Sequence, residues 1–325
     1  MFAACTGDGP AVESDATEVV QAVDIVRLDQ ALFQAPVPEL RRVSDSLRRT
    51  HPGIYRTYIE DILQGAPVDD PRLPVVLSRF VSDPDWRAAQ QAADSALGDL
   101  AREKALFRTA FARLKAHFPD SLVPRLVAYN AGFNYGIYPA DSMLGFGVEW
   151  FIGPQHPVIG YLAPEDFPAY VKARMTPAML VPSAVKGWLL VHYMGDVSGE
   201  DLLGHLVATG RVMALLEELL PGVDPSWCFA FTPEQLTWCE ANEFMVWKEM
   251  VEKEMLFSRK AQDIGRMLND GPFTNGFPRE SPGHIGEWIG YRMVKAYQKA
   301  HPGLSYAQLF AIDDPREVLK FYKPR

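Results

Sequence analysis

Apolar residues recur at helical spacing along most of the chain. Trp86, Leu97 and Leu114 belong to one such stripe, which predicts a single long helix over residues 84–117. Prolines and glycines interrupt the pattern often, as expected for short helices joined by ordered loops. The same spacing predicts further helices at 37–50, 52–64, 71–81, 166–174, 178–193, 199–220, 233–256, 282–299, 305–311 and 315–321.

Residues 124–153 have a different pattern. They are rich in Val, Tyr, Phe and Gly, and two runs near 125–131 and 144–151 predict strands. The run VDIVRL at 23–28 predicts one more short strand. We therefore expect an α+β fold, predominantly helical, with a small mid-chain antiparallel sheet in a single domain.

The N-terminal residues differ from the rest of the chain. Phe2-Ala3-Ala4-Cys5 has the form of a lipobox, in which the cysteine is acylated after signal cleavage. Only four residues precede Cys5, so the charged and apolar parts of a signal peptide are missing, and a chance cysteine in a frayed tail is the alternative. No composition shift marks a later boundary. The sequence predicts a lipobox remnant and flexible tether over 1–22, and one domain over 23–325.

Composition and charge exclude several classes of protein. The formal net charge is −9 and no Lys/Arg run stands out, so nucleic acid is not an expected partner. No stretch approaches 18 uninterrupted apolar residues, which excludes a spanning helix. Cys228 and Cys239 form no CxxC and so do not indicate a thiolate zinc site. They could pair in an oxidising compartment, but we favour two small buried hydrophobic residues.

Familiar catalytic motifs are missing from the chain. No two of the seven histidines lie within five residues, so there is no HExxH zinc helix. The chain also has no GxSxG elbow, no P-loop and no GxGxxG. The sequence therefore predicts no cofactor.

One carboxylate falls on an apolar helix face. Glu243 lies four residues from both Cys239 and Trp247 in the helix predicted at 233–256. A buried carboxylate needs a partner or a raised pKa. It could act as a general base or metal ligand, but we favour a structural anchor. The partner would then be Arg211, Lys248 or a loop backbone.

The stretch SPGHIGEWIG, residues 281–290, reads as a helix start, with Ser281 as N-cap and proline next. Yet Gly283, Gly286 and Gly290 each weaken a helix by about 1 kcal/mol. The four-residue spacing of Gly286 and Gly290, beside Trp288, predicts a close crossing with a neighbouring helix. A bound ligand is the second interpretation.

The loop before this helix, residues 269–283, contains three prolines and three glycines. It could frame a pocket, with the helix N-terminus offering N–H groups to an anion. Alternatively it packs Phe273 and Phe277 into the core, which we favour.

These segments carry a family resemblance. The stretches TPEQLTWCEANEFMVWKEM, GPFTNGFPRESPGHIGEWIGYRMVKAY and the terminal KFYKPR resemble the GldB-type gliding-motility lipoproteins of the Bacteroidetes. VEWFIGPQHP and YVKARMTPAMLVPSAV fit the same pattern, so the likeness covers about residue 23 to the C-terminus. It implies acylation of Cys5, a membrane anchor in the bacterial cell envelope facing the periplasm, and protein partners there.

That family is remotely similar to predicted zinc proteases, which carry HExxH on one helix and Glu-Gly on the next. Here the first motif would fall near 184–188 and the second at Thr209-Gly210. The only histidines nearby, His192 and His205, are thirteen residues apart. The resemblance therefore implies a zinc-protease-like scaffold without its metal.

We expect a non-enzymatic component of gliding motility, or of the associated secretion machinery, that acts by protein binding. The rival hypothesis is an envelope hydrolase in which Glu243 and His284 converge with His192 or His205 within about 4–6 Å. A third is an envelope protein without an anchor. The candidate pocket or binding residues are Gln235, Trp238, Glu243, Trp247, Thr274, Ser281, Gly283, His284, Gly286, Trp288 and Gly290.

Overall fold

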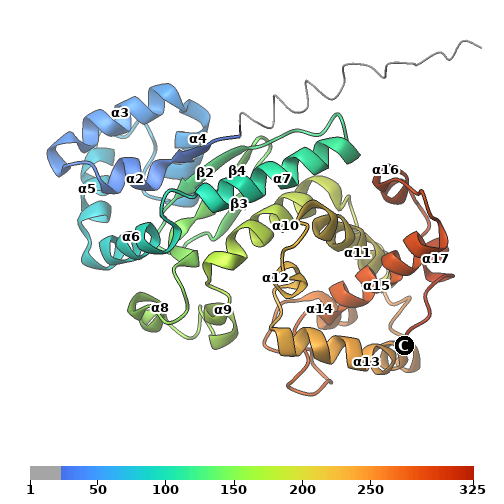
Figure 1. Cartoon of the computed structure of the whole chain (residues 1–325). Helices are drawn as coiled ribbons and strands as arrows, with labels where there is room; N and C mark the ends of the chain where they lie inside the picture. Colours follow the sequence, from blue (N-terminus) through green and yellow to red (C-terminus); the bar gives the residue numbers. More distant parts are fainter. Residues whose placement is uncertain (1–22) are drawn as a thin grey trace, which may run out of the picture.

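A computed structural model describes residues 23–325 of the chain (Figure 1). A four-stranded sheet lies at one end of the molecule and a group of helices at the other. The strands stand in the order β1-β2-β4-β3 across the sheet. Their bounds are β1 (Ile25–Arg27), β2 (Arg125–Tyr129), β3 (Ile137–Pro139) and β4 (Met143–Gly147).

The predicted strands exist, but the prediction of an antiparallel sheet was wrong, because the sheet is mixed. β1, β2 and β4 run parallel, and only β3 is antiparallel, to β4. Parallel neighbours require a long crossover, and residues 28–124 supply one between β1 and β2. Hydrophobic spacing predicts where strands occur, but it does not predict whether neighbouring strands run parallel or antiparallel. β3 was not predicted, because it has three residues and ends in proline.

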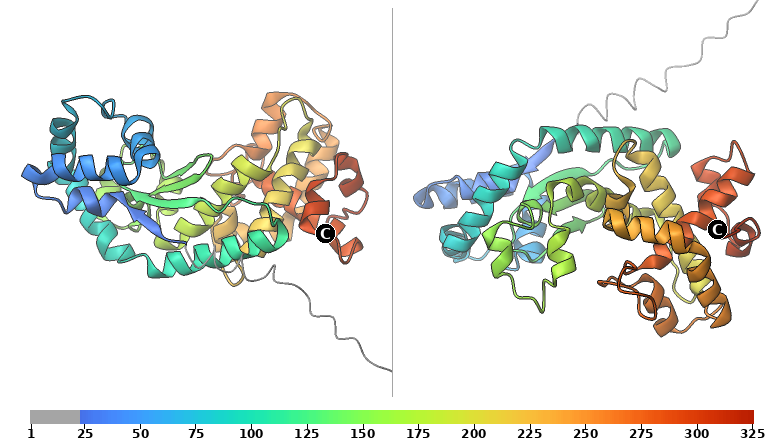
Figure 2. Two further views of the ribbon diagram at one scale, coloured as in Figure 1. Left: turned by 90° about the horizontal axis from the view of Figure 1, so that it is seen from above. Right: turned by 60° about the horizontal axis from the view of Figure 1, so that its bottom comes forward.

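Helices cover both faces of the sheet (Figures 1 and 2). Successive side chains of β2 alternate between the two faces. Leu126 and Ala128 pack into the core beneath α7 and α10, whereas Val127 and Tyr129 pack beneath the N-terminal helices. These N-terminal helices are α2 (Leu28–Phe33), α3 (Leu40–Thr50) after the 3-10 turn Val37–Glu39, α4 (Pro52–Thr57) with a π-helical turn at Tyr58–Ile62, and α5 (Leu73–Ser82).

The single long helix predicted over 84–117 was wrong. The structure has two helices, α6 (Pro84–Leu97) and α7 (Ala101–His117). Between them the chain turns through left-handed backbone, with φ of 56° at Gly98 and 60° at Leu100. Leu100 is fully buried, so tertiary packing holds an unfavourable conformation that the continuous apolar stripe does not show.

The C-terminal half is organised around two crossing helices, α11 (Leu202–Leu219) and α15 (Ile285–Ala300). A Cβ on Gly290 would overlap the carbonyl oxygen of Leu206 and lie 2.7 Å from its carbonyl carbon. A Cβ on Gly210 would lie 2.8 Å from the backbone nitrogen of Tyr291. The predicted close crossing is therefore confirmed, and its neighbour is α11.

The other helices surround this crossing and connect it to the sheet. α8, α12 and α14 were not predicted; the first two have only five residues each, and α14 has no side-chain cap. No helix within residues 23–325 is both long enough and apolar enough to cross a membrane. The remaining bounds are the 3-10 turns Val148–Phe151 and Pro177–Met179, α8 (Pro157–Tyr161), α9 (Ala169–Ala173), α10 (Leu180–Tyr193), α12 (Pro225–Phe229), α13 (Pro233–Glu252), α14 (Ala261–Leu268), α16 (Tyr306–Phe310) and α17 (Pro315–Leu319).

Candidate functional site

The predicted site residues lie on α13, on α15 and in the 269–284 loop that joins α14 to α15. This loop closes on itself. The Thr274 hydroxyl donates to the carbonyl of Pro282 at 2.8 Å, and the Thr274 N–H donates to the Ser281 hydroxyl at 3.3 Å. Thr274 and Ser281 are both buried. The sequence predicted Thr274 and Ser281 as pocket or binding residues. In the structure their side chains hold the loop in shape.

The helix after the loop begins at Ile285, so the predicted start at Pro282 with Ser281 as N-cap was wrong. His284 precedes the helix with a left-handed φ of 42°. Gly283 lies against the other end of the loop, where an added Cβ would be 2.7 Å from the Gly271 nitrogen. Residues 282–284, which the local sequence predicts as the first helical turn, therefore belong to the closed loop instead.

His284 fastens the loop to α12. Its Nε2 lies 2.9 Å from the Phe229 carbonyl oxygen, and its Nδ1 lies 3.1 Å from Asp270 Oδ1. A carbonyl and a carboxylate only accept hydrogen bonds. Both ring nitrogens are therefore engaged by structural partners, and neither is left free to contact a substrate.

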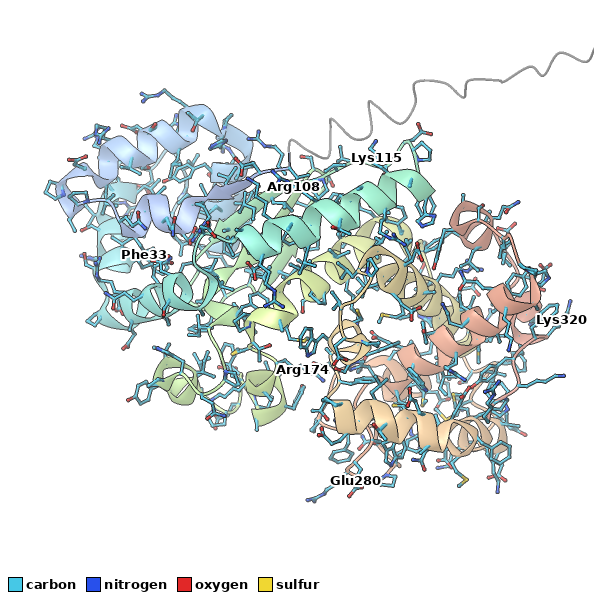
Figure 3. The ribbon with its side chains drawn as sticks, viewed as in Figure 1. Phe33, Arg108, Lys115, Arg174, Glu280 and Lys320 are labelled. Carbon is cyan, nitrogen blue, oxygen red and sulfur yellow. The ribbon has the colours of Figure 1, made fainter. Side chains whose placement is uncertain are left out.

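Asp270 is held by two side chains, His284 and Arg174. Arg174, which Figure 3 shows next to α9, donates to both of its oxygens at 2.8 and 2.9 Å. Burial alone would raise the pKa of Asp270, but hydrogen bonds from His284 and Arg174 hold it well below its usual range. The three side chains join α9, the 269–284 loop and α12 through charge-assisted bonds.

Glu243 is buried on α13, as its position on the apolar face predicted. Its Oε2 lies 3.1 Å from a guanidinium nitrogen of Arg292 on α15. A basic partner was predicted, but the named candidates were wrong. Lys248 pairs with Glu252, and Arg211 donates to the carbonyl of Ile312.

Replacing Arg292 with methionine should destabilise the fold by about 2 kcal/mol, because a buried carboxylate is left without its counter-charge. Chemical denaturation at pH 7 measures the change. The matched test is the double variant Glu243→Leu/Arg292→Met, in which both charges are removed and most of the stability should return. A double variant less stable than Arg292→Met would contradict this account.

The other predicted residues have separate packing partners. Trp238 packs edge-on to Phe277 with ring centroids 6.4 Å apart, and Trp247 packs on Tyr322 at 5.1 Å. Gln235 completes the predicted capping box at Thr232. Trp288 and Gly286 lie buried on α15. The structure thus gathers these residues around one set of helices but not around a single cavity.

A groove of about 570 Å³ does lie beside the loop. Its walls come from α14 and from the first half of the 269–284 loop. Arg266 is fixed there, because it donates to the Asn275 carbonyl at 2.7 Å and to Glu249 at 2.9 Å. Both polar and apolar residues line the groove. They include Gln262, Arg266, Asn269, Asp270, Phe273 and Asn275.

The residues of the rival hydrolase site have different environments. His192 stacks on Trp188 with ring centroids 3.8 Å apart and lies 3.2 Å from the Ala140 carbonyl. In the described chain, residues 23–325, no three His, Cys, Asp or Glu side chains are grouped so that they could hold a metal ion. Cys228 and Cys239 are buried and unpaired, and burial raises the pKa of Cys228 to about 12. Cys5 lies outside the described residues.

Sequence reasoning missed a buried polar cluster where the parallel strands end. Glu149 follows β4 and accepts from the Ala131 and Phe133 N–H groups at 2.9 and 3.1 Å. Asn130 follows β2, and its side-chain amide donates to the Gln90 side-chain oxygen on α6 at 3.2 Å. Burial raises the pKa of Glu149 to about 7. A polar residue within two positions of the end of each of two buried strands was the signal that could have found the cluster.

The family relationship is clear from comparison with known proteins. A family model described as gliding motility protein GldB matches residues 10–324, nearly the whole chain. The chain therefore belongs to the GldB family, as its motifs predicted. No curated protein and no solved structure matches it. The zinc-protease-like scaffold accordingly stays a prediction.

Proposed function

We propose that this GldB-family protein is a lipid-anchored, non-enzymatic component of gliding motility or of the associated secretion machinery. It acts by protein binding through the groove between α14 and the 269–284 loop. The observation that carries the proposal is the placement of His284, whose two ring nitrogens both lie within hydrogen-bond distance of structural partners. A ring whose two nitrogens are both engaged in this way positions a loop and leaves neither nitrogen free to act on a substrate.

The anchor is Cys5, placed after Phe2-Ala3-Ala4, and it tethers the domain to the cell envelope with the domain facing the periplasm. The full-length Cys5→Ala variant should incorporate no labelled fatty acid and should move from the membrane to the soluble fraction. Cys228→Ala, which changes a buried thiol, is the matched control and should label normally. Equal labelling of Cys5→Ala and the parent protein would contradict the anchor.

Protein binding can be tested by photo-crosslinking in the source organism. A benzophenone side chain at the exposed groove position Gln262 should give a discrete crosslinked protein band. The same side chain at Val75, exposed on α5 far along the sequence, should give none. Equal bands from both positions, or none from Gln262, would contradict binding at this groove.

The hydrolase alternative makes a different prediction. If His284 and Glu243 were catalytic, His284→Gln and Glu243→Gln would abolish motility while the protein still folded. We expect both variants to restore motility to a deletion strain in proportion to their folded level, measured by limited proteolysis of cell extracts. Loss of motility at a normal folded level would favour the hydrolase.

A further inference from the structure

Half of the exposed large apolar side chains belong to segments near the end of the chain. Ten are exposed within the described residues, and five of these belong to the second half of α13, the residues after it, and the C-terminus. The other five are spread over the rest of the chain, between Val37 and Val191. We call the first group the C-terminal face. It consists of Phe244, Met245, Val251, Phe257 and Phe321.

Contacts between the segments make this face continuous. Trp247 of α13 packs on Tyr322, and the Phe244 backbone nitrogen lies 2.9 Å from the Arg325 carbonyl oxygen. The guanidinium of Arg316 lies over the ring of Phe257, 5.7 Å from its centroid. The end of the chain therefore runs along α13 and joins its apolar side chains into one surface.

One margin of the C-terminal face, residues 315–325, is basic in a protein that is acidic overall. Residues 315–325 contain Arg316, Lys320, Lys323 and Arg325 but only one acid, Glu317, a net of 4 − 1 = +3. The other residues then carry −9 − 3 = −12. Among residues 23–325, no ion pair involves the last three of these cations. Figure 3 shows Lys320 at the outer margin of the molecule.

We propose that the C-terminal face docks on an anionic lipid surface. Exposed Phe and Met side chains among lysines and arginines are the composition of interfacial membrane contacts, in which rings enter the headgroup layer and cations meet lipid phosphates. The net +3 of residues 315–325 is attracted to anionic lipid, so this margin would lead the contact, with the apolar side chains of α13 beside it. The docking is a second membrane contact, separate from the Cys5 anchor of the proposed function.

The two contacts lie at opposite ends of the molecule. The described chain starts next to β1, far from α13 in Figure 1. The residues from Cys5 to Val23 span at most roughly 60 Å when extended, compared with a radius of gyration of roughly 19 Å for a domain of this size. The anchor therefore reaches a membrane on which the C-terminal face rests, with the long axis of the domain along the surface.

The test uses the full chain with Cys5→Ala, so that no lipid contributes to binding. Sedimentation with vesicles of phosphatidylglycerol and phosphatidylethanolamine should retain the protein, and vesicles of phosphatidylcholine alone should not. Binding should weaken at least tenfold between 50 and 500 mM salt.

Two matched triple variants assign the contact to this face. Lys320→Glu/Lys323→Glu/Arg325→Glu should weaken binding at least tenfold, since each cation near a charged surface contributes about 1 kcal/mol. A control with the same change of charge is Arg41→Glu/Arg49→Glu/Arg79→Glu, on exposed positions of α3 and α5, and it should bind like the parent. Circular dichroism confirms that both fold.

Equal loss of binding in both triple variants would overturn the proposal, because net charge alone would then explain it. No binding to anionic vesicles would also overturn it and leave the face to a protein partner. Phe244→Ser/Phe321→Ser separates the apolar contribution and should reduce the binding that persists at 500 mM salt. Neither failure affects fatty-acid labelling of Cys5, so the proposed function is tested separately.

Discussion

Gly290→Ala is expected to destabilise the protein by at least about 3 kcal/mol and to leave little folded chain at 37 °C. The added Cβ would overlap the Leu206 carbonyl oxygen. That oxygen belongs to helix backbone, so it cannot rotate away as a side chain does. Relief requires α11 and α15 to separate, and both helices bury most of the faces on which they meet. Thermal melting followed by circular dichroism measures the effect.

Gly53→Ala is the matched control for this prediction. Gly53 lies in α4 with negative φ, and an added Cβ meets no atom within 4 Å. Alanine there should leave stability unchanged or raise it by up to about 1 kcal/mol, because it restricts the unfolded chain. Similar melting of the two variants would show that the helix crossing is not the close contact described above.

Stability should fall as the pH rises from about 5 to about 7.5. Burial raises the pKa of Glu149 from 4.5 to about 7 in the folded protein, so the folded state holds this proton more tightly than the unfolded chain does. The stabilisation is complete below pH 4.5 and is lost as the pH passes through 7. It amounts to about 3 kcal/mol, which urea denaturation at several pH values can resolve.

Glu149→Gln should remove this pH dependence. The amide oxygen can still accept from Ala131 and Phe133, and the side chain stays neutral at every pH. The variant should match the parent near pH 5 and exceed its stability by up to about 3 kcal/mol at pH 8. Glu165→Gln, at an exposed carboxylate, should keep the parental slope. An unchanged slope in Glu149→Gln would show that another group titrates.

The sequence pattern correctly predicted features that depend on residues close together in the chain. The apolar stripe on α13 placed Glu243 in the core, and the spacing of Gly286 and Gly290 predicted the helix crossing. These inferences succeeded because side chains three and four residues apart share a helix face. The identity of the neighbour was not predictable, since Gly210 lies eighty residues away and on a helix with no distinctive pattern of its own.

Failures occurred where distant contacts override local preference. His284 takes left-handed backbone because Gly283 lies against Gly271, so α15 starts later than its sequence suggests. Leu100 does the same within an unbroken apolar stripe, because its side chain is fully buried. The partner of Glu243 was likewise missed, since Arg292 belongs to another helix and only packing brings it near. In each case the deciding contact joins residues that the sequence separates.

The position of β1 has a mechanical consequence. In a protein anchored through Cys5, any force between membrane and domain enters through the residues before Val23 and reaches β1 first. This strand has three residues, lies at the margin of the sheet and pairs only with β2 among the described strands. Behind it, Leu28 and Asp29 are fully buried. Under a pulling force, β1 would detach from β2 while the helical core stays folded. The part of the domain that unfolds first would therefore be the part attached to the tether.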